Sequence, residues 1–579
     1  MDGQLTRPYG DNPFTIMTRR LSARLKAFYY TSRLHDMRLK GNAPLKLITA
    51  PNNPWVGEVG IGAQIITNVF SYGGHQQTTS DNKPWPETAN APEMFYNWLY
   101  GFSWLSDLDE MADKRLAQEK AETLLKYWIA HHKSWSARAW KPELIGERLT
   151  TWILHSPLIL SNSDLVYRSS VINCLVGQAR HLNYVVATAP MGVPRVKASV
   201  GLAISGLLIP DSEERFTKAM KVLNKTLDSF ILPDGGVTSR NPRDGIEVLK
   251  SLIILMKVLD SQNRERPSWL QFSCDKLVPF LRALSHGDGG FAHFGGAFAN
   301  DSRDLKKIIE LSNSKGRASN NLPFVGYQRL KKHRTLIIAN VGPPPEPSLS
   351  HAAAANALAI EVSDGNDRII VGSGGTLPDF DGKGEYAKTA KAQMWARNTS
   401  AHSTAVFAGD NSSNIQAGNA IGRAAFETSF ERHESEEGIW LEASHNGYEK
   451  KYNTIHTRRI FINNEGTDIR GEDTLTRGVS GLAKIFASKT PLPVKIHFHI
   501  HPSISLSPNQ AGNSIILRLQ HGHGWLFQAK GGEIELEDSV YSQEPSLIKN
   551  TSQISLNWVL GINQTLQFKW SLKRLDHKE

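Results

Sequence analysis

The sequence is poor in cysteine and in long apolar runs. It holds two cysteines, Cys174 and Cys274, both in apolar, helical-looking contexts. We expect buried free thiols, with a single disulfide as the alternative. A cysteine-ligated metal site would need more thiols than this. No uninterrupted apolar run reaches the roughly 18–20 residues that cross a bilayer, so we expect no transmembrane segment.

The first 41 residues also lack the apolar core of a signal peptide. On this ground alone we expect a cytoplasmic protein or a non-standard export route. Residues Leu21–Lys40 mix Arg and Lys with Leu, Phe and Tyr at roughly helical spacing. We expect an amphipathic helix that packs on its own domain, and a position on an anionic membrane surface is the alternative.

Length and charge narrow the class of protein. A chain of 579 residues is too long for one ordinary core, so we expect at least two domains. The formal net charge is +10, from 66 basic and 56 acidic residues. A basic solvated surface and an anionic partner explain this excess equally well. No zinc-finger, RNA-binding or helix-turn-helix motif is present, so we expect no nucleic-acid partner.

The N-terminal half has helical periodicity. From Phe95 to about Leu284, apolar residues recur at three- and four-residue intervals between short turn signals. The later predicted helices are Leu165–Ala189, Arg195–Leu208, Glu213–Ile231, Gly245–Leu259 and Ser268–Leu284. Many short helices in succession are typical of hairpins stacked into a solenoid or a closed toroid.

From Tyr327 onward, short β-branched runs are separated by Gly, Asn and Asp. The DGN of SDGNDR and the NNEG of INNEGT predict hairpin turns. Strands at this spacing predict a large antiparallel sandwich. The predicted fold class is therefore a multidomain α+β protein, with a helical domain at residues 1–320 and a β-sandwich at residues 321–579.

Several motifs occur in an order that is familiar. The stretch ILPDGGVTSRNPRDGIEVLKSLIILM is followed by LSHGDGGFAHFGG, GYQRL, ANVGPPP, LAIEV, IIVGSGG, RNTSAHSTAVF, HNGYEKKYNTIHTRRI, GTDIRGED and FHIHP. Over about Trp140 to Trp570 the chain thereby resembles the heparinase II/III-like family of polysaccharide lyases.

The resemblance implies an (α/α) toroid, a β-sandwich and an active cleft between them. It also implies β-elimination on an acidic, uronate-containing polysaccharide, and a place in the cell envelope or periplasm. That reaction needs a group that neutralises the carboxylate next to the abstracted proton. It also needs a base that removes the proton and an acid that protonates the leaving oxygen.

The sequence departs from the family pattern where the chemistry is expected. The resemblance places an Asn-His pair at Val193 and Pro194, and neither residue can donate a side-chain hydrogen bond or accept a proton. A catalytic Tyr is expected after the DGG segment, where Arg243 and Asp244 stand instead. Tyr184 is the nearest alternative tyrosine, although helical tyrosines usually pack.

The metal ligands of the family are also incomplete. The resemblance places ligands at Ala354, Gly372 and His402, and only the histidine is present. His351 lies three residues too early to replace the first of them. One histidine cannot hold a zinc ion that takes about four ligands, so we expect no metal and no other cofactor.

The remaining polar groups give the candidate site. We expect proton transfer by His402, His445 and Tyr448, and glycan binding by Arg240, Asn241, Arg397, His456 and Arg458, because arginine matches a carboxylate with two parallel hydrogen bonds. Asn241 before Pro242 is equally a helix cap. The His445 to Arg458 segment is equally a solvated strand face. If the glycan is acidic, positive charge should concentrate in the cleft, at Arg195, Lys197, Arg240, Arg243, Arg458 and Arg459.

Two other functions stay open. A glycan-binding or envelope-assembly protein that has lost the chemistry would explain the missing family residues. A toroidal glycoside hydrolase would use two carboxylates, for which Asp234, Asp288 and Asp473 are available. The sequence leaves the polymer and the oligomeric state open.

Overall fold

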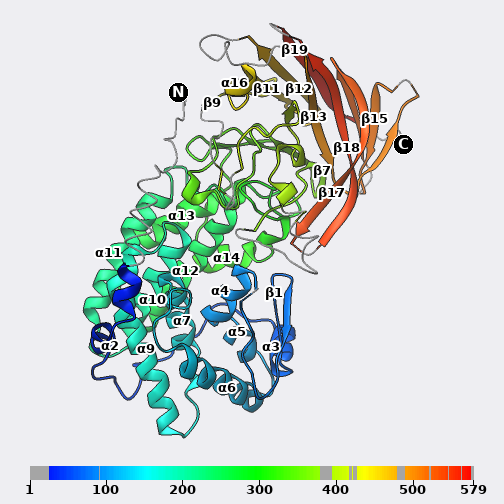
Figure 1. Cartoon of the computed structure of the whole chain (residues 1–579). Helices are drawn as coiled ribbons and strands as arrows, with labels where there is room; N and C mark the ends of the chain where they lie inside the picture. The colour runs from blue at the N-terminus through cyan, green and yellow to red at the C-terminus, as the bar shows by residue number, and fades with distance from the viewer. Residues whose placement is uncertain are drawn as a thin grey trace.

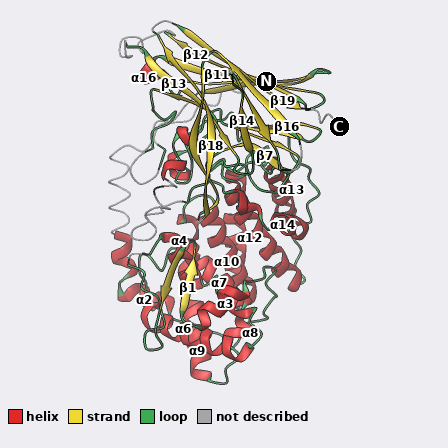
Figure 2. Cartoon of the chain, turned by 90° about the vertical axis from the view of Figure 1, so that its right-hand side faces the viewer, coloured by secondary structure: helices red, strands yellow, loops and turns green. Residues whose placement is uncertain are grey.

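The structure is a computed structural model in which residues 25–89, 91–377, 391, 394–415, 420–421, 427–478, 490–510, 512–520, 523–545, 547–561 and 564–575 are described. A helical domain forms one end of the molecule and a β-sandwich the other, as Figure 1 and Figure 2 show. The predicted order of a helical half followed by an antiparallel half is confirmed. The proposed division at residues 320 and 321 lies between the last helix of the helical domain and the first strand of the sandwich.

Where the sequence predicted helices, between Phe95 and about Leu284, the helices of the helical domain agree with the apolar periodicity to within a few residues. They are α2 (Arg33–Leu39), α3 (Val59–Ile66), α4 (Glu93–Gly101), α5 (Leu105–Asp109), α6 (Lys114–His132), α7 (Pro142–Leu154), α8 (Ser156–Ile159), α9 (Leu165–Val185), α10 (Val193–Leu208), α11 (Glu213–Phe230), α12 (Pro242–Ser261), α13 (Ser268–Ala283) and α14 (Leu305–Ser312). Short 3₁₀ turns follow α9 as η1 (Val186–Thr188) and precede α14 as η2 (Ala299–Ser302). No helix among the described residues is both long and apolar enough to cross a bilayer.

Side-chain caps fix where several helices begin. Asp164 accepts hydrogen bonds from the backbone N–H groups of Val166 and Tyr167 at the start of α9. Asn241 accepts from the N–H of Arg243, and Pro242 is the first residue of α12. Each cap satisfies backbone donors that have no partner inside the helix. Asn241 is therefore the N-cap of α12, as one of its two interpretations predicted.

Helix α10 is the centre of the helical domain and packs on α7, α11 and α12. Its contact with α7 depends on two glycines, because a Cβ on Gly201 would stand 2.0 Å from the carbonyl oxygen of Gly146. The two backbones therefore touch where they cross. This contact places Glu147, the residue after Gly146, beside Lys197 near the start of α10.

Between α2 and α4 the chain forms elements that the sequence did not predict, α3 and a β-hairpin. A hairpin of β1 (Val69–Tyr72) and β2 (His75–Thr78) turns at Gly73 and Gly74, both with positive φ. Residues 25–30 and α2 are helical and lie on α9, where His35 Nε2 is 3.0 Å from His181 Nδ1. The described part of the predicted amphipathic segment thus contacts its own domain. Residues 21–24 lie outside the described residues.

The sandwich consists of two antiparallel sheets. The first has the strand order β14 (Ser505–Pro508), β15 (Ser514–Arg518), β16 (Gly524–Lys530), β19 (Thr565–Leu575), β12 (Asp468–Arg477), β11 (Thr454–Asn463), β10 (Gly438–His445) and β9 (Thr428–Glu434). The second has the order β17 (Glu533–Glu544), β18 (Leu547–Leu560), β13 (Leu492–Ile500), β7 (Asp367–Val371), β6 (Ile360–Asp364), β5 (Thr335–Asn340), β4 (Tyr327–Lys332) and β3 (Asn321–Leu322), with β8 (Ala405–Phe407) paired to β13. Alternating residues of both sheets, among them Ile460, Phe498 and Trp570, form the shared core.

Both predicted hairpin turns are present. Strands β6 and β7 are joined by Gly365 and Asn366, and Gly365 has φ 58°. Strands β11 and β12 are joined through Gly466, with φ 66°. The first loop has two residues and the second has four, 464–467, and each contains a residue with left-handed backbone, which explains its glycine.

Arg240 fastens the two domains together. It lies in the loop before α12 with φ 61° and is buried. Its guanidinium donates to the carbonyl oxygens of Val325, Gly326, Gly342 and Pro343 and to Asn340 Oδ1, at 2.5–3.1 Å. Tyr327 on β4 donates back to the Arg240 carbonyl at 2.9 Å.

Candidate functional site

The predicted His445 to Arg458 group forms a buried chain of hydrogen bonds between β10, β11 and β12. His445 Nε2 is 3.2 Å from His456 Nδ1, and His456 Nε2 is 2.8 Å from Asp473 Oδ1. Arg458 donates to both carboxylate oxygens of Asp473, at 2.6 and 3.1 Å. All four side chains are buried. The structure thus brings the predicted residues together, but inside the sandwich.

In this hydrogen-bonded network the charges of Asp473 and Arg458 neutralise each other. Burial opposes ionisation of Asp473, but Arg458 and His456 hold its pKa well below the usual range. Burial, His456 and Arg458 lower the pKa of His445 far below 6.5, so this ring stays neutral. Arg458 also donates to the carbonyls of Leu358 and Ser403, both at 2.8 Å. The network ties the first sheet to the segment before β8.

The other two predicted proton-transfer groups lie in the same region. Tyr448 is buried and donates to the carbonyl oxygen of Ala405 at 2.9 Å, and burial raises the pKa of its phenol. His402 is buried, its Nε2 is 2.9 Å from the carbonyl oxygen of Ala396, and burial lowers its pKa to about 4. Arg397 is buried as well and donates to the carbonyls of Ala353 and Ser350.

Gly372 lies beside His402, as the resemblance implies. A Cβ at this glycine would stand 3.2 Å from His402 Nδ1 and 3.3 Å from Glu361 Oε1. The buried Glu361 carboxylate instead accepts hydrogen bonds from the N–H groups of His293 and Gly372 and lies 3.1 Å from His286 Nε2. Within the described ranges, no three His, Cys, Asp or Glu side chains are arranged to hold a metal ion.

The three carboxylates considered for a hydrolase have structural partners. Asp234 accepts from the N–H groups of Gly236, Phe324 and Val325. Asp288 accepts from Nε and Nη2 of Arg368, at 2.7 and 3.0 Å. Asp473 lies within β12, where the nearby Gly471 packs under Trp570.

The positions where the sequence departs from the family converge on a different place. Lys197 lies one helical turn after Val193 and Pro194 on α10, and its ammonium is 3.4 Å from Glu147 and 3.0 Å from Glu247. Arg243 and Asp244 open α12 one turn before Glu247. Tyr72 at the end of β1 interacts electrostatically with this group. We name Tyr72, Glu147, Lys197, Arg243, Asp244 and Glu247 the Lys197 cluster.

Backbone packing explains why the cluster forms. The direct contact between Gly146 and Gly201 brings Glu147 of α7 against α10. The Gly73–Gly74 turn carries Tyr72, whose ring stacks on Trp98 with centroids 5.3 Å apart and planes 5° apart. Neither contact has a signal in the sequence beyond isolated glycines. Sequence reasoning missed Tyr72, Glu147 and Glu247 for this reason.

The cations of the cluster already have partners. Although burial opposes it, Glu147 and Glu247 raise the pKa of Lys197 above its ordinary value. Burial also opposes ionisation of Glu247, but Lys197, Lys250 and Arg243 lower its pKa to about 2. Arg243 pairs with Asp301 at 2.8 Å. The cluster therefore holds two cations, Lys197 and Arg243, and three carboxylates, Glu147, Asp244 and Glu247, so it has no excess of positive charge.

Tyr72 is the most accessible member of the cluster, with 39% of its surface exposed. Its hydroxyl is nevertheless surrounded by protein, and this burial, together with Glu247, raises its pKa to about 12. The phenol is thus protonated at neutral pH. Binding sites for small molecules commonly combine an exposed aromatic side chain with a few charged or hydrogen-bonding groups, as here.

Comparison with known proteins connects these features to a family. Residues 314–571 match the model of the heparinase II/III-like C-terminal domain. Over 556 residues the chain is 25% identical to FtsZ-localized protein C of Caulobacter vibrioides, which covers 95% of this chain and 94% of that protein.

Solved structures with low sequence identity share the whole fold. A heparinase III matches with a TM-score of 0.71 at 12% identity and covers 99% of this chain and 93% of its own. A mutant of the heparan sulfate lyase HepC from Pedobacter heparinus matches with a TM-score of 0.62 at 14% identity and covers 96% and 89%. The helical domain followed by the sandwich is thus the toroid-plus-sandwich architecture of these enzymes. Residues 314–571 thus match the heparinase II/III-like C-terminal domain, and the whole chain shares the fold of these solved structures.

Proposed function

We propose that this chain is a polysaccharide-lyase-like protein that binds an acidic glycan without cleaving it by β-elimination. The observation that carries the proposal is the Lys197 cluster. At the positions where the family pattern places its reactive groups, the chain has Val193 and Pro194, and both cations of the cluster, Lys197 and Arg243, are paired with carboxylates of the protein. A paired cation is a poor partner for the charge that develops during β-elimination.

The eight residues that the sequence selected have roles of another kind in this proposal. His402, His445, Tyr448, Arg240, Asn241, Arg397, His456 and Arg458 are buried and bonded to backbone or to one another. We propose that they hold the sandwich and the domain junction in place. Glycan contact is assigned instead to the Tyr72 face.

The test combines a cleavage assay with a binding assay. The protein is incubated with alginate, heparan-type and chondroitin-type polymers, and ultraviolet absorbance of a 4,5-unsaturated product is followed. Calorimetry on the same polymers measures binding. We expect heat of binding to at least one polymer and no increase in absorbance. An increase in absorbance that scales with protein concentration would contradict the proposal.

Substitution at Tyr72 locates the binding. Tyr72→Ala should weaken glycan binding about tenfold, because base-stacking and sugar-stacking on aromatic faces contribute on the order of 1–3 kcal/mol. The matched control is Tyr184→Ala, which removes a tyrosine of similar exposure, 47%, from the outer side of α9. Equal losses in the two variants would show that binding does not involve the Lys197 cluster.

A second candidate function is β-elimination with Tyr72 as the proton donor. The raised pKa of Tyr72 favours this role, since a phenol that stays protonated can give its proton to a leaving oxygen. Under this candidate, Tyr72→Phe would remove the absorbance increase while leaving binding within about twofold. No effect of Tyr72→Phe on an observed activity would exclude it.

We also propose a role at the cell envelope. The supporting observation is the similarity to a Caulobacter protein that is named for its localisation with FtsZ. A fluorescent fusion of this chain should then concentrate with FtsZ in cells. A uniform distribution of the fusion would contradict this proposal without affecting the glycan-binding one.

A further inference from the structure

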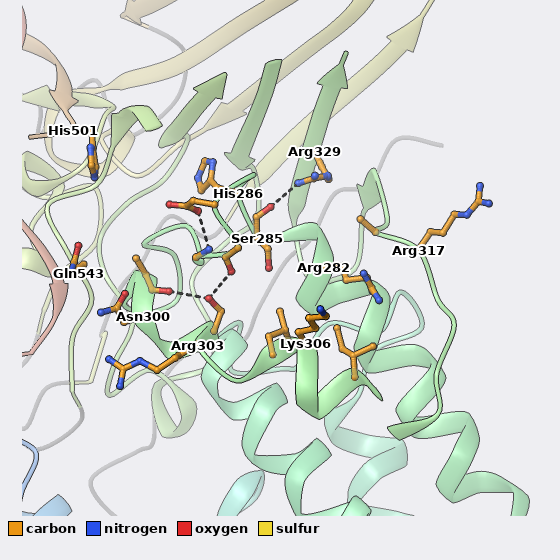
Figure 3. A pocket seen from close by; sticks show the side chains of 18 of the residues that line it. Arg282, Ser285, His286, Asn300, Arg303, Lys306, Arg317, Arg329, His501 and Gln543 are labelled. Carbon is orange, nitrogen blue, oxygen red and sulfur yellow. Dashed lines mark hydrogen bonds between the residues drawn. The ribbon is translucent and has the colours of Figure 1, made fainter. Parts of the chain in front are cut away.

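A cavity of about 950 Å³ opens on the side of the domain junction (Figure 3). Its walls come from α13, α14, η2, the 285–290 loop, β4 and the ends of β13 and β17. We name it the junction cavity. It is separate from the Lys197 cluster, because η2 lies between them: Asp301 of η2 pairs with Arg243, while Asn300 and Ser302 line the cavity.

The lining of the junction cavity is basic. Its charged residues are Arg282, Arg303, Lys306, Arg317 and Arg329 against Asp288 and Glu310, an excess of three positive charges. Arg282, Lys306 and Arg317 are exposed, and no ion pair joins them to another described residue. Figure 3 shows Arg282 and Lys306 projecting from neighbouring helices, with Arg317 on the segment that follows. These three cations are free to bind an anion.

Two of the carboxylates at the cavity are bound to other groups, which leaves Glu310 as the remaining acidic residue of the lining. Asp288 is held by Arg368 through two hydrogen bonds. Glu544, at the edge of the cavity, takes Arg303 at 3.4 Å and the amide of Asn300 at 2.9 Å. The contrast with the Lys197 cluster is plain, since there every cation named above has an internal carboxylate.

A β-bulge directs one polar side chain into the cavity. The pairing of β17 with β18 shifts register between Ser542 and Glu544, which leaves Gln543 opposite no residue. Bulges are common beside binding sites because they redirect a side chain. Gln543 lines the cavity, where its amide can bond a hydroxyl group. An amide next to cations suits a ligand that carries both hydroxyls and acidic groups.

The floor of the cavity is rigid. Arg329 is buried and donates to the carbonyls of Ala283 and Ser285, at 3.2 and 3.1 Å. Ser302 donates to the carbonyl of Gly289 at 2.6 Å, and His286 Nδ1 lies 2.9 Å from Ser363 Oγ. A floor that is fixed before binding lowers the entropy cost of holding a ligand.

We propose that the junction cavity is a binding site for the carboxylate or sulfate groups of an acidic oligosaccharide, with Arg282, Lys306 and Arg317 as its cations and Gln543 as its hydroxyl-binding group. The choice of a sugar rather than another polyanion rests on the proposed function. The location and the sign of the ligand's charge do not. Recognition of acidic groups is thereby assigned to the side of the junction, and sugar stacking to Tyr72.

The test measures binding of size-defined oligoglucuronates and sulfated heparin oligosaccharides to the full chain by calorimetry at two salt concentrations. The triple variant Arg282→Ala, Lys306→Ala, Arg317→Ala should lose at least tenfold in affinity and show a weaker dependence on salt, because exposed cations act through screened electrostatics. The matched control is Lys221→Ala, Lys225→Ala, Lys257→Ala. It removes the same charge from exposed positions on α11 and α12. The control should bind within about twofold of the unchanged protein.

Each alternative outcome has a defined meaning. Equal losses in the two triple variants, or equal binding of neutral dextran, would overturn the proposal. Tight binding of single-stranded DNA that the cavity variant abolishes, with no binding of either oligosaccharide, would replace the sugar by a nucleic acid and also overturn it. Gln543→Ala should weaken the oligosaccharides but leave inorganic sulfate unaffected, and the reverse result would contradict the role of the amide. Tyr72→Ala reports on the proposed function separately, because it leaves the cavity cations in place.

Discussion

At the scale of single residues, three arginines show the limit of sequence reasoning. Arg240, Arg397 and Arg458 were selected because a guanidinium matches a carboxylate. In the structure, Arg240 and Arg397 donate mainly to backbone carbonyl oxygens, and Arg458 divides its donors between the buried Asp473 and two backbone carbonyls. An arginine that satisfies carbonyls and one that binds a substrate have the same letter and similar neighbours. What separates them is burial, and burial depends on strands that are distant in the sequence.

The first prediction concerns the buried pair of Arg458 and Asp473. Asp473→Asn leaves a buried guanidinium without its counter-charge, and breaking such a pair costs about 3–5 kcal/mol. We expect the free energy of unfolding of the sandwich to fall by that amount in urea denaturation. Arg459→Ala is the control. The Arg459 side chain is next to Arg458 in the sequence but is 48% exposed, and its ion pair with Glu442 lies at the surface. Exposed pairs contribute about 0–1 kcal/mol, so a similar loss in both variants would contradict the role given to burial.

At the scale of elements, local signals predicted most boundaries and failed where contact between elements decided the structure. The Asn241–Pro242 cap and the start of α11 at Glu213 could be read from the chain, because caps and periodicity act within a few residues. The β1–β2 hairpin could not. Its strands are four residues each and contain Ser, Tyr, His and Gln, so they lack a strong alternating pattern. Tyr72 was missed with them.

The second prediction tests the contact between α7 and α10. Gly201→Ala places a Cβ 2.0 Å from the Gly146 carbonyl oxygen, so the helices must separate. We expect a loss of stability of about 1–3 kcal/mol, as for other overpacked cores. We also expect weaker glycan binding, since Lys197 and Glu147 move apart. Calorimetric melting and the glycan-binding assay measure the two effects.

Gly177→Ala on α9 is the control for the second prediction. A Cβ at Gly177 meets nothing within 4 Å. Alanine is favoured over glycine inside a helix by about 0.8–1.0 kcal/mol. The control should therefore be neutral or more stable, and stabilisation by Gly201→Ala would show that the α7–α10 contact is looser than described.

At the scale of the whole molecule, the change from helical to strand-like texture predicted the two-domain architecture, and the structure confirms it. The location of the site could not be predicted in the same way. The Lys197 cluster draws on β1, α7, α10 and α12, and the junction cavity draws on both domains. Such sites exist only after the elements pack, and a single sequence does not state which helix faces touch.

The third prediction concerns the coupling of the two domains. Arg240→Ala removes five donors from buried carbonyl and amide oxygens at the junction. Each unsatisfied buried acceptor costs about 1–3 kcal/mol, so we expect the single melting transition of the protein to separate into two in calorimetry. Arg317→Ala, which removes an exposed guanidinium near the same junction, should leave one transition. A single, unshifted transition for Arg240→Ala would show that the domains are coupled by other contacts.

The last prediction is the dependence of stability on acid. Burial lowers the pKa of His402, of His497 and of His501 to about 4, against 6.5 for an unhindered histidine. As pH falls below 6.5 the unfolded chain takes up protons at these rings while the folded chain does not, so unfolding becomes more favourable. Each ring costs about 1.4 kcal/mol per pH unit within this window. Carboxylates with lowered pKa, such as Glu537 at about 2, begin to contribute only below 4.5. We therefore expect the urea midpoint to be level from pH 8 to 7 and to fall steadily between pH 6.5 and 4.5.

His497→Gln keeps a side chain that can bond Ser555, whose hydroxyl is 3.0 Å from the ring, and removes one titrating group that faces Glu537 and Lys495. Its midpoint should fall less steeply over the same interval, and a midpoint that is equal at pH 5 and pH 7.5 in the unchanged protein would contradict the prediction.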